Sequence, residues 1–279
     1  MQVFQAAKQA ALAQAGAIGK GSKPIAHVGA GLAKGTKKKA AAPRRTRPKT
    51  RVFDGTKALH LVFDDGSWID YQPDHFTPAE CKERRTEFEQ KVPFVAEAKF
   101  FGHASKRNVK WFGSFDYTYS RTVKKADPMP QWCATLAERA EKYAEEALRR
   151  CSPPGTAIVR PSYVTGGDLM NEYVGPNQGV MAHSDSEDGL APGVPIIGMT
   201  ITTPGAERSI TFRHKAFRYG NIKLRLRNGS IYAMGGTCQK HWTHAIEADK
   251  SVPATATRWS HTWRQYKTSL PLRDVATAP

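Results

Sequence analysis

The sequence predicts an α+β protein, in which a β-sandwich or jelly roll is backed by helices and preceded by a basic, disordered N-terminal tail. Three features of the chain lead to this prediction. Residues 1–53 contain 12 Lys and Arg and no Asp or Glu. Two helical patterns then occur between residues 77 and 150, and short β-rich runs follow them. Strands that form a block after the helices are typical of a helix-backed sandwich, whose inner faces can hold a metal.

The basic tail is the first element. The whole chain carries a formal charge of +17, so the 12 charges of the tail leave only about +5 for the rest. Residues 34–51, KGTKKKAAAPRRTRPKTR, mix Lys, Arg, Ala and Pro as histone-like tails do, which favours an extended segment near DNA or RNA. We expect a nuclear import signal here and a nuclear protein. The alternative is a transit peptide for a mitochondrion or plastid, because residues 1–20 lack acidic residues, although they are poor in Ser and Arg.

A β-hairpin is expected over residues 58–72, because alternating apolar residues flank Asp65-Gly66, a dipeptide that accepts the positive φ angles of a tight turn. Two helices follow. The first is expected over residues 77–92, with Thr77 as N-cap and Glu80 completing a capping box. The second is expected over residues 131–150, with one apolar face. The remaining strands are expected within residues 193–205, 208–217, 222–236 and 255–267, which are broken by Pro-Gly, Asn-Gly and Gly-Gly pairs.

Size, charge and cysteine spacing bound the class of protein. A chain of 279 residues with 40% hydrophobic content can bury one substantial core, so residues 54–279 are expected to form one domain. No apolar run approaches the roughly 20 residues needed to span a bilayer, so no membrane partner is expected. The positive charge favours a polyanionic partner, DNA or RNA. The four cysteines are widely spaced, which fits a reducing compartment and excludes a zinc-finger pattern. A monomer is expected.

The stretch MAHSDSED, residues 181–188, holds a candidate metal site. His183 and Asp185 are two residues apart, so on a strand they share one face. His244 is the candidate third ligand, in or just after the strand that follows Asn228-Gly229. Two imidazoles and one carboxylate form the facial triad of non-haem Fe(II) oxygenases. The alternatives are a solvated turn for the first pair, an ordinary strand histidine for His244, or His241 as the ligand.

A second constellation is RWSHTWR, residues 258–264. The residues at spacing two, which share one strand face, are Arg258, Ser260, Thr262 and Arg264. Two arginines directed into a sandwich interior need anionic partners, and a dicarboxylate would supply both charges. The alternative is an exposed strand whose buried face carries Trp259 and Trp263.

In this order the motifs resemble those of the AlkB family of Fe(II)- and 2-oxoglutarate-dependent dioxygenases, whose final motif is R-x-N-x-T-x-R. N-E-Y at residues 171–173 is similar to the family's N-x-Y before the metal motif. The resemblance runs from about Phe100 to Lys267. It implies a double-stranded β-helix (jelly roll) core within residues 161–270, with a nucleotide-recognition and helical part at residues 54–160.

The resemblance also implies cofactors and the residues that bind them. Fe(II) would be held by His183, Asp185 and His244, with dioxygen as the oxidant. The residues implied for the cosubstrate 2-oxoglutarate are Arg258 and Arg264 at its two ends, assisted by Asn171, Tyr173 and Ser260. Arginine suits both ends because its guanidinium pairs bidentately with carboxylates. Ser260 replaces the family's Asn and shortens one polar contact to the cosubstrate.

Residues 99–120, which are both aromatic and basic, resemble the nucleotide-recognition region of AlkB members that repair duplex DNA. The resemblance implies Phe101 as an apolar wedge in the duplex and Arg107 as a charged contact near the flipped nucleotide. It implies Tyr117 and Tyr119 as the base-contacting pair, and Glu187 as a contact to the exocyclic amine of the base. The alternatives are a hairpin with core aromatics and, for Glu187, a solvated acidic loop.

The function implied by the resemblance is oxidative demethylation of 1-methyladenine and 3-methylcytosine in DNA, single- or double-stranded, as direct DNA repair. An RNA or protein demethylase on the same scaffold is the alternative within enzymes. A catalytically inactive, basic nucleic-acid-binding protein is the alternative from another class.

Overall fold

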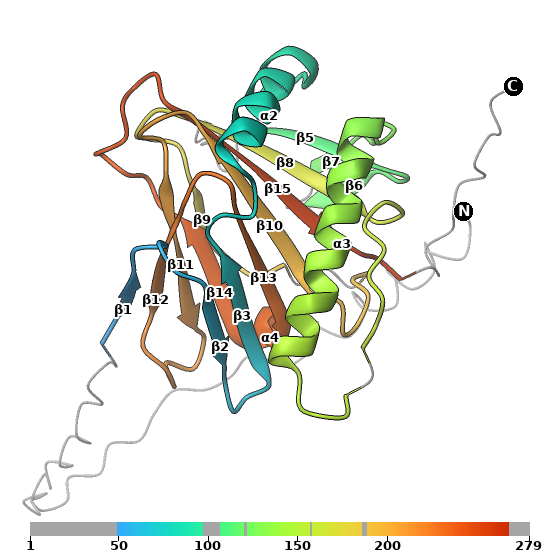
Figure 1. The fold of residues 1–279 in the computed structure, drawn as a ribbon, viewed down its shortest axis with the longest axis vertical. Coiled ribbons are helices and arrows are strands. Elements are labelled where there is room, and N and C mark those ends of the chain that lie inside the picture. Colours follow the sequence, from blue (N-terminus) through green and yellow to red (C-terminus); the bar gives the residue numbers. More distant parts are fainter. Residues whose placement is uncertain (1–48, 97–106, 120–121, 157, 186–188, 268–279) are drawn as a thin grey trace, which may run out of the picture. The chain divides into compact units, whose positions relative to one another are not determined.

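The computed structural model describes residues 49–96, 107–119, 122–156, 158–185 and 189–267, all of which belong to one compact unit, Thr46–Pro279. For residues 117–119 and 122 it describes the backbone only. Two β-sheets pack together in this unit, and two long helices lie on the other side of the larger sheet (Figure 1). Among the described residues, no helix combines the length and apolar character that crossing a membrane requires.

The larger sheet has eight antiparallel strands in the order β2-β3-β13-β10-β15-β8-β5-β4. Its central strand β10 is buried along its whole length, because the sheet is covered on both faces. The strands of this sheet are β2 (Leu59–Val62), β3 (Ser67–Gln72), β4 (Val95–Ala96), β5 (Asn108–Gly113), β8 (Gly167–Val174), β10 (Ile196–Thr202), β13 (Ser230–Gly236) and β15 (Thr257–Arg264).

The smaller sheet has five strands in the order β1-β12-β11-β14-β9, and only β1 runs parallel to its neighbour. A separate two-stranded ribbon pairs β6 with β7. The strands are β1 (Arg51–Phe53), β9 (Val180–His183), β11 (Arg208–His214), β12 (Ile222–Leu226) and β14 (Trp242–Ile246) in the sheet, and β6 (Tyr117–Tyr119) and β7 (Thr122–Lys124) in the ribbon.

The helices form where local sequence signals predict them. Helix α2 (Pro78–Lys91) begins with a complete capping box, in which Thr77 Oγ1 accepts from Glu80 N while Glu80 accepts from Thr77 N. Helix α3 (Gln131–Cys151) buries a face rich in alanine against the larger sheet, and small side chains allow this close approach. The short helix α4 (Cys238–His241) joins β13 to β14.

The two largest apolar clusters of the described residues lie on the two sides of the larger sheet. One lies between the helices and the larger sheet and includes Trp259 and Trp263 of β15. The other lies between the two sheets and includes Tyr173, Phe212 and Tyr232. A sandwich with helices on one side is the fold that the sequence predicts, and the predicted hairpin and both predicted helices are confirmed.

Two sequence-based boundaries are wrong. The predicted tail ends too late, because residues 51–53 form β1 and Arg51 N donates to Asn221 O. The predicted division at residue 160 does not separate two parts, because β2, β3 and β5 lie in the same sheet as β8, β10, β13 and β15. The Asn228-Gly229 pair leads from β12 in one sheet to β13 in the other, so its function is to cross between sheets. The rest of the predicted tail, residues 1–48, lies outside the described residues.

Candidate active site

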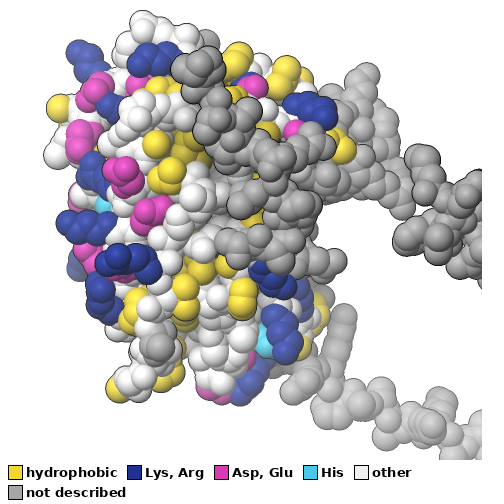
Figure 2. All heavy atoms as spheres, turned by 90° about the vertical axis from the view of Figure 1, so that its right-hand side faces the viewer, with side chains coloured by type: hydrophobic (Ala, Val, Ile, Leu, Met, Phe, Trp, Pro, Cys, Tyr) yellow, Lys and Arg dark blue, Asp and Glu magenta, His cyan; other side chains and the backbone are white. Residues whose placement is uncertain are grey.

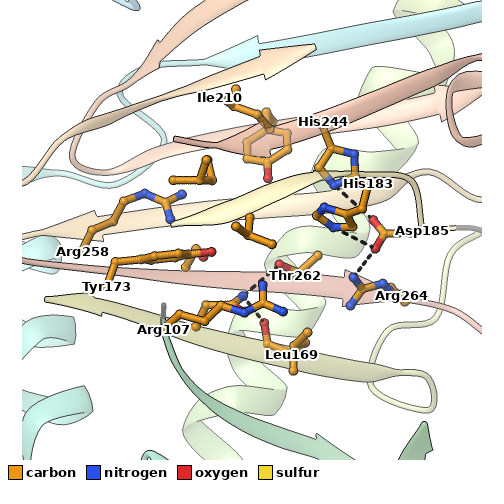
Figure 3. A pocket seen from close by; sticks show the side chains of 15 residues that line it. Arg107, Leu169, Tyr173, His183, Asp185, Ile210, His244, Arg258, Thr262 and Arg264 are labelled. Atoms are coloured by element: carbon orange, nitrogen blue, oxygen red, sulfur yellow. Dashed lines mark hydrogen bonds and ion pairs between the residues drawn. The ribbon is translucent and has the colours of Figure 1, made fainter. Parts of the chain in front are cut away.

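A small cavity opens between the two sheets. Strand β15 crosses it with one face, and β8, β9 and β14 contribute most of the other walls. Figure 3 shows an acidic and imidazole-bearing end with Asp185, and an opposite end with Arg258 and Tyr173. The lining side chains are those of Arg107, Leu169, Asn171, Tyr173, Val180, His183, Asp185, Ile210, Tyr232, His244, Ile246, Arg258, Ser260, Thr262 and Arg264.

The predicted metal ligands meet at one end of this cavity. His183 ends β9 and lies opposite His244 of β14 in register, so that their ring centres are 4.4 Å apart. Asp185 follows two residues after His183 and is 2% exposed. Its Oδ1 lies 3.8 Å from His183 Nε2, and its Oδ2 lies 3.5 Å from His244 Nε2. All three ligand atoms are within 4.8 Å of one another, a geometry that one metal ion can span.

Protonation also suits a metal. The carbonyl oxygen of Met181 can only accept and lies 2.9 Å from His183 Nδ1, so Nδ1 donates this hydrogen bond and Nε2 is the atom on the side of Asp185. Burial lowers the pKa of His244 to about 3, which keeps this imidazole neutral. Burial alone would raise the pKa of Asp185, but Arg264 and the two imidazoles hold that pKa below its ordinary value. A neutral imidazole at His244 and an ionised carboxylate at Asp185 are the protonation states that metal ligands require.

Arg264 connects the metal end to β15. Its Nη2 donates to Asp185 Oδ1 at 2.6 Å, and both side chains are buried. Such a charge-assisted hydrogen bond fixes the orientation of the carboxylate. The backbone N–H of Asp185 donates to Gln239 Oε1 at 3.0 Å, which holds the same residue from α4. Oδ2 of Asp185 accepts no hydrogen bond from the residues that the structure describes and is available to an ion.

Arg258 lies at the other end and is 1% exposed. Its Nη2 donates to Thr200 Oγ1 at 3.0 Å, and the guanidinium lies 5.2 Å from the ring centre of Tyr173. The Nε and Nη1 atoms of Arg258 have no hydrogen-bond partner among the described residues, although both are buried. A buried guanidinium with two unused donors requires an anion. A carboxylate of 2-oxoglutarate fits this requirement.

The predicted face of β15 is confirmed. All four residues of the spacing-two set line the cavity, while Trp259 and Trp263 are buried on the helix side. The alternative of an exposed strand is excluded, because both faces of β15 are covered. Asn171 also lines the cavity, but its Nδ2 donates to Leu169 O at 3.1 Å and lies 3.5 Å from Thr262 Oγ1.

The competing ligand His241 lies outside the metal cluster. It ends α4, and its ring stacks on His214 with centres 6.1 Å apart. His244 itself lies in β14, beyond α4, rather than in the strand that directly follows Asn228-Gly229.

Of the predicted substrate contacts, Arg107 lines the cavity and is 6% exposed. Tyr117 and Tyr119 lie in β6, of which the structure describes the backbone. Phe101 and Glu187 lie outside the described residues.

Three residues of the site could not be expected from the sequence. Gln239 accepts a hydrogen bond from the backbone of Asp185, and Thr200 accepts one from Arg258. The third residue, Tyr232, lines the cavity. Gln239 belongs to no motif and is 54 residues from Asp185 in the chain. Only the pairing of the strands brings them to the site.

The model of the 2OG-Fe(II) oxygenase superfamily matches residues 73–268. The chain is 29% identical to the mouse DNA oxidative demethylase ALKBH2 over 192 residues, which are 64% of this chain and 73% of that protein. It is also 29% identical to the human DNA oxidative demethylase ALKBH2 over 196 residues, or 64% of this chain and 67% of that protein. The solved structure of OsALKBH1 superposes with a TM-score of 0.53 over 75% of this chain and 100% of that chain. At 14% identity this likeness shows a common fold.

Proposed function

Because this chain belongs to the 2OG-Fe(II) oxygenase superfamily and is an AlkB-type oxidative demethylase, we propose that it removes methyl groups from alkylated nucleobases in DNA. The lesions are 1-methyladenine and 3-methylcytosine, and the reaction serves direct DNA repair. The observation that carries the proposal is one cavity that holds a His-Asp-His cluster at one end and a buried arginine with unused donors at the other.

In this assignment each residue has a defined task. His183, Asp185 and His244 hold Fe(II), and Arg264 keeps the Asp185 carboxylate oriented. When bound, Fe(II) and 2-oxoglutarate reduce dioxygen, so that the methyl group leaves as formaldehyde while 2-oxoglutarate becomes succinate and carbon dioxide. Three ligands from the protein leave positions for the cosubstrate and for dioxygen.

The cosubstrate is held across the cavity. Arg258 offers Nε and Nη1 to the carboxylate far from the metal, and Tyr173 packs beside its guanidinium. Arg264 lies at the metal end, so the two arginines are placed for the two ends of a dicarboxylate. Apolar walls from Leu169, Val180 and Ile210 exclude water between these ends, which strengthens the charge pairing.

Arg107 supports a nucleotide as the substrate. Its guanidinium is on the wall of the same cavity as the metal cluster, next to Leu169 and Thr262 in Figure 3. A cation there can contact the backbone or ring of a nucleotide whose methyl group points at the metal. The two relatives named DNA oxidative demethylase support DNA over RNA or protein as the polymer.

The basic N-terminal segment is proposed to add a sequence-independent grip on DNA and to direct the protein to the nucleus. On the face shown in Figure 2, Lys and Arg lie interspersed with Asp and Glu. Many cations of the described residues are paired with carboxylates, as Arg84 is with Glu87 and Arg139 with Glu80. The concentrated positive charge of the chain is therefore in residues 1–53, where 12 cations meet no acidic residue.

The test uses purified protein with Fe(II) and 2-oxoglutarate on oligonucleotides that carry one 1-methyladenine or one 3-methylcytosine. Single-stranded DNA, duplex DNA and RNA of the same sequence are compared, and the unmethylated base, formaldehyde and succinate are measured together. We expect equal amounts of base and formaldehyde from DNA, and none from Asp185→Ala. Exclusive turnover of RNA, or succinate without any demethylated base, would contradict the proposal.

A further inference from the structure

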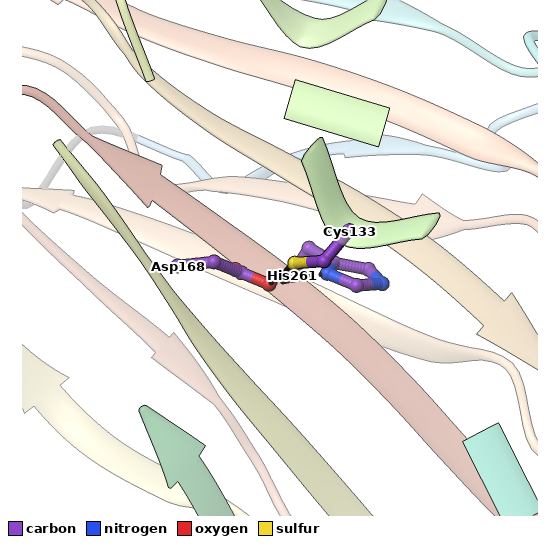
Figure 4. Close-up of side chains that lie close together, drawn as sticks. All are labelled: Cys133, Asp168 and His261. Carbon is purple, nitrogen blue, oxygen red and sulfur yellow. Dashed lines mark hydrogen bonds and ion pairs between the residues drawn. The ribbon is translucent and has the colours of Figure 1, made fainter. Parts of the chain in front are cut away.

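Behind the strand that carries both arginines lies a buried polar cluster that the proposed chemistry does not use. Its three members are Cys133 of α3, Asp168 of β8 and His261 of β15 (Figure 4). None is more than 1% exposed, and all lie on the helix side of the sheet, among aromatic side chains. Asp168 Oδ2 is 2.5 Å from His261 Nδ1 and 3.7 Å from Cys133 Sγ.

This cluster sits at an interruption of the β8–β15 pairing. Ser260 pairs with Asn171, and Trp263 pairs with Asp168. Between these two pairs, residues 261–262 of β15 form no ladder pairs with residues 169–170 of β8. The backbone N–H of Thr262 donates instead to Asp168 Oδ1 at 3.0 Å. Leu169 O accepts instead from Asn171 Nδ2 at 3.1 Å. Two side chains thus satisfy the backbone groups that the open ladder leaves without partners.

The interruption lies directly under the cosubstrate cavity. The side chain of Thr262 faces the cavity between Ser260 and Arg264, while its backbone N–H is held from behind by Asp168. The position of this backbone determines where Arg264 stands relative to Arg258. A carboxylate is a strong, directional acceptor for such an N–H, and it remains buried only because further donors satisfy it.

We propose that Asp168, oriented by His261, is a positioning residue for 2-oxoglutarate. His261 Nδ1 holds Oδ2, so that Oδ1 is directed at Thr262 N. The thiol of Cys133, which belongs to α3, donates to the same carboxylate. The proposal concerns cosubstrate binding and does not depend on the identity of the methylated substrate.

A matched control exists at the other end of α3. Asp70 of β3 is also 0% exposed, lies 2.6 Å from His60 Nδ1 and 3.7 Å from Cys151 Sγ, and accepts from Tyr143 and Arg150. Within the described part of the chain Asp70, unlike Asp168, accepts only from side chains, and it does not line the cavity. Asp70 therefore anchors α3 without a link to β15.

A metal site is the competing interpretation of the Cys133, Asp168 and His261 cluster. Two ligands on one ion with bonds of about 2.1 Å and tetrahedral angles stand roughly 3.4 Å apart. The 2.5 Å between Asp168 Oδ2 and His261 Nδ1 is much shorter than this separation and corresponds to a short, direct hydrogen bond between the two side chains. The geometry therefore favours a hydrogen-bonded network.

The test compares Asp168→Leu, Asp168→Asn and His261→Phe with the control Asp70→Leu. Dissociation of 2-oxoglutarate is measured by calorimetry on protein loaded with Mn(II), together with melting temperature and metal content. We expect Asp168→Leu to weaken 2-oxoglutarate binding about tenfold, because Thr262 N loses a charged acceptor. Asp168→Asn keeps an acceptor oxygen and should therefore retain most of the wild-type affinity for 2-oxoglutarate. His261→Phe keeps the ring that stacks on Trp263 but frees the carboxylate, and should weaken binding about threefold.

The control separates positioning from general stability. Asp70→Leu should lower the melting temperature as much as Asp168→Leu while it changes 2-oxoglutarate affinity less than about twofold. Unchanged affinity in both Asp168→Leu and His261→Phe, or an equal loss in Asp70→Leu, would overturn the proposal. If Asp168→Leu does not fold, the His261→Phe result decides alone. A second equivalent of metal in the wild type that Cys133→Ser lacks would also overturn it, because the cluster would then be a metal site.

Discussion

His183 and His244 lie directly opposite each other on β9 and β14, with their ring centres 4.4 Å apart. One strand pairing therefore brings together two ligands that are 61 residues apart in the chain. Asp185 lies two residues after the end of β9, and its carboxylate accepts a hydrogen bond from Arg264.

Removal of any one ligand should abolish turnover. In His183→Ala, Asp185→Ala and His244→Ala we expect Fe(II) content to fall and 2-oxoglutarate decarboxylation to drop by at least about a hundredfold. His241→Ala is the control, because His241 stacks on His214 outside the cluster. Iron retained in His244→Ala but lost in His241→Ala would show that the ligand assignment is wrong.

Arg258→Met should have opposite effects on stability and cosubstrate binding. Burial lowers the pKa of this guanidinium, and two of its donors have no partner among the described residues. An apolar side chain of similar length should therefore raise the melting temperature of the 2-oxoglutarate-free protein. The same change should remove the rise in melting temperature that 2-oxoglutarate produces in the wild type. A lower melting temperature without cosubstrate would contradict this expectation.

Lowering the pH should destabilise the protein, and protonation of His75 should contribute to this loss of stability. Burial and the positive charge of Arg139 lower the pKa of His75 to about 4, and the neutral ring accepts from Arg139 Nε at 3.1 Å. The folded state then resists a proton that the unfolded chain takes up below its ordinary pKa of 6.5. The free energy of unfolding should decrease between pH 6.5 and 4, by at most about 1.4 kcal/mol per pH unit from this group.

Urea unfolding of the metal-free protein at several pH values measures this slope. His75→Gln keeps an acceptor for Arg139 and does not titrate, so its slope over this window should be smaller. An identical slope in both proteins would assign the effect to other groups.

Phe101→Ala should distinguish duplex repair from work on single strands. If Phe101 fills the gap left by a flipped nucleotide, activity on duplex DNA should fall much more than activity on single strands. Arg107→Ala should impair both, since Arg107 lines the cavity itself. A core role for Phe101 would instead lower the melting temperature and both activities in parallel, with a loss of about 3–5 kcal/mol in stability.

Deletion of residues 1–45 should weaken DNA binding and flatten its dependence on salt, because 9 Lys and Arg are removed with no acidic residue. The deletion stops before β1, whose pairing with β12 belongs to the fold. Turnover at saturating substrate should survive. An unchanged salt slope, with loss of the protein from mitochondria or plastids in cells, would favour the transit-peptide alternative.

The sequence predicts those features that depend on local signals. The capping box at Thr77 and Glu80 marks the start of α2, and spacing two in residues 258–264 predicts which side chains of β15 face the cavity. The contact of Gln239 with Asp185 cannot be predicted in this way. It depends on how β13 and β14, which flank α4, pair with strands that are distant in the sequence. The hydrogen bond from Thr262 N to Asp168 cannot be predicted from the sequence either, because it forms where the pairing of β8 with β15 is interrupted.

The chain passes repeatedly between the two sheets from β8 to β15, and this divides the catalytic groups between them. Both imidazoles belong to the smaller sheet, whereas both arginines belong to the larger one. Iron together with its cosubstrate therefore cross-links the sandwich, so each should increase the affinity of the protein for the other. The free energy of that linkage resists separation of the sheets. Protease digestion should accordingly be slowest when both are bound, and the protection should exceed the sum of what each gives alone.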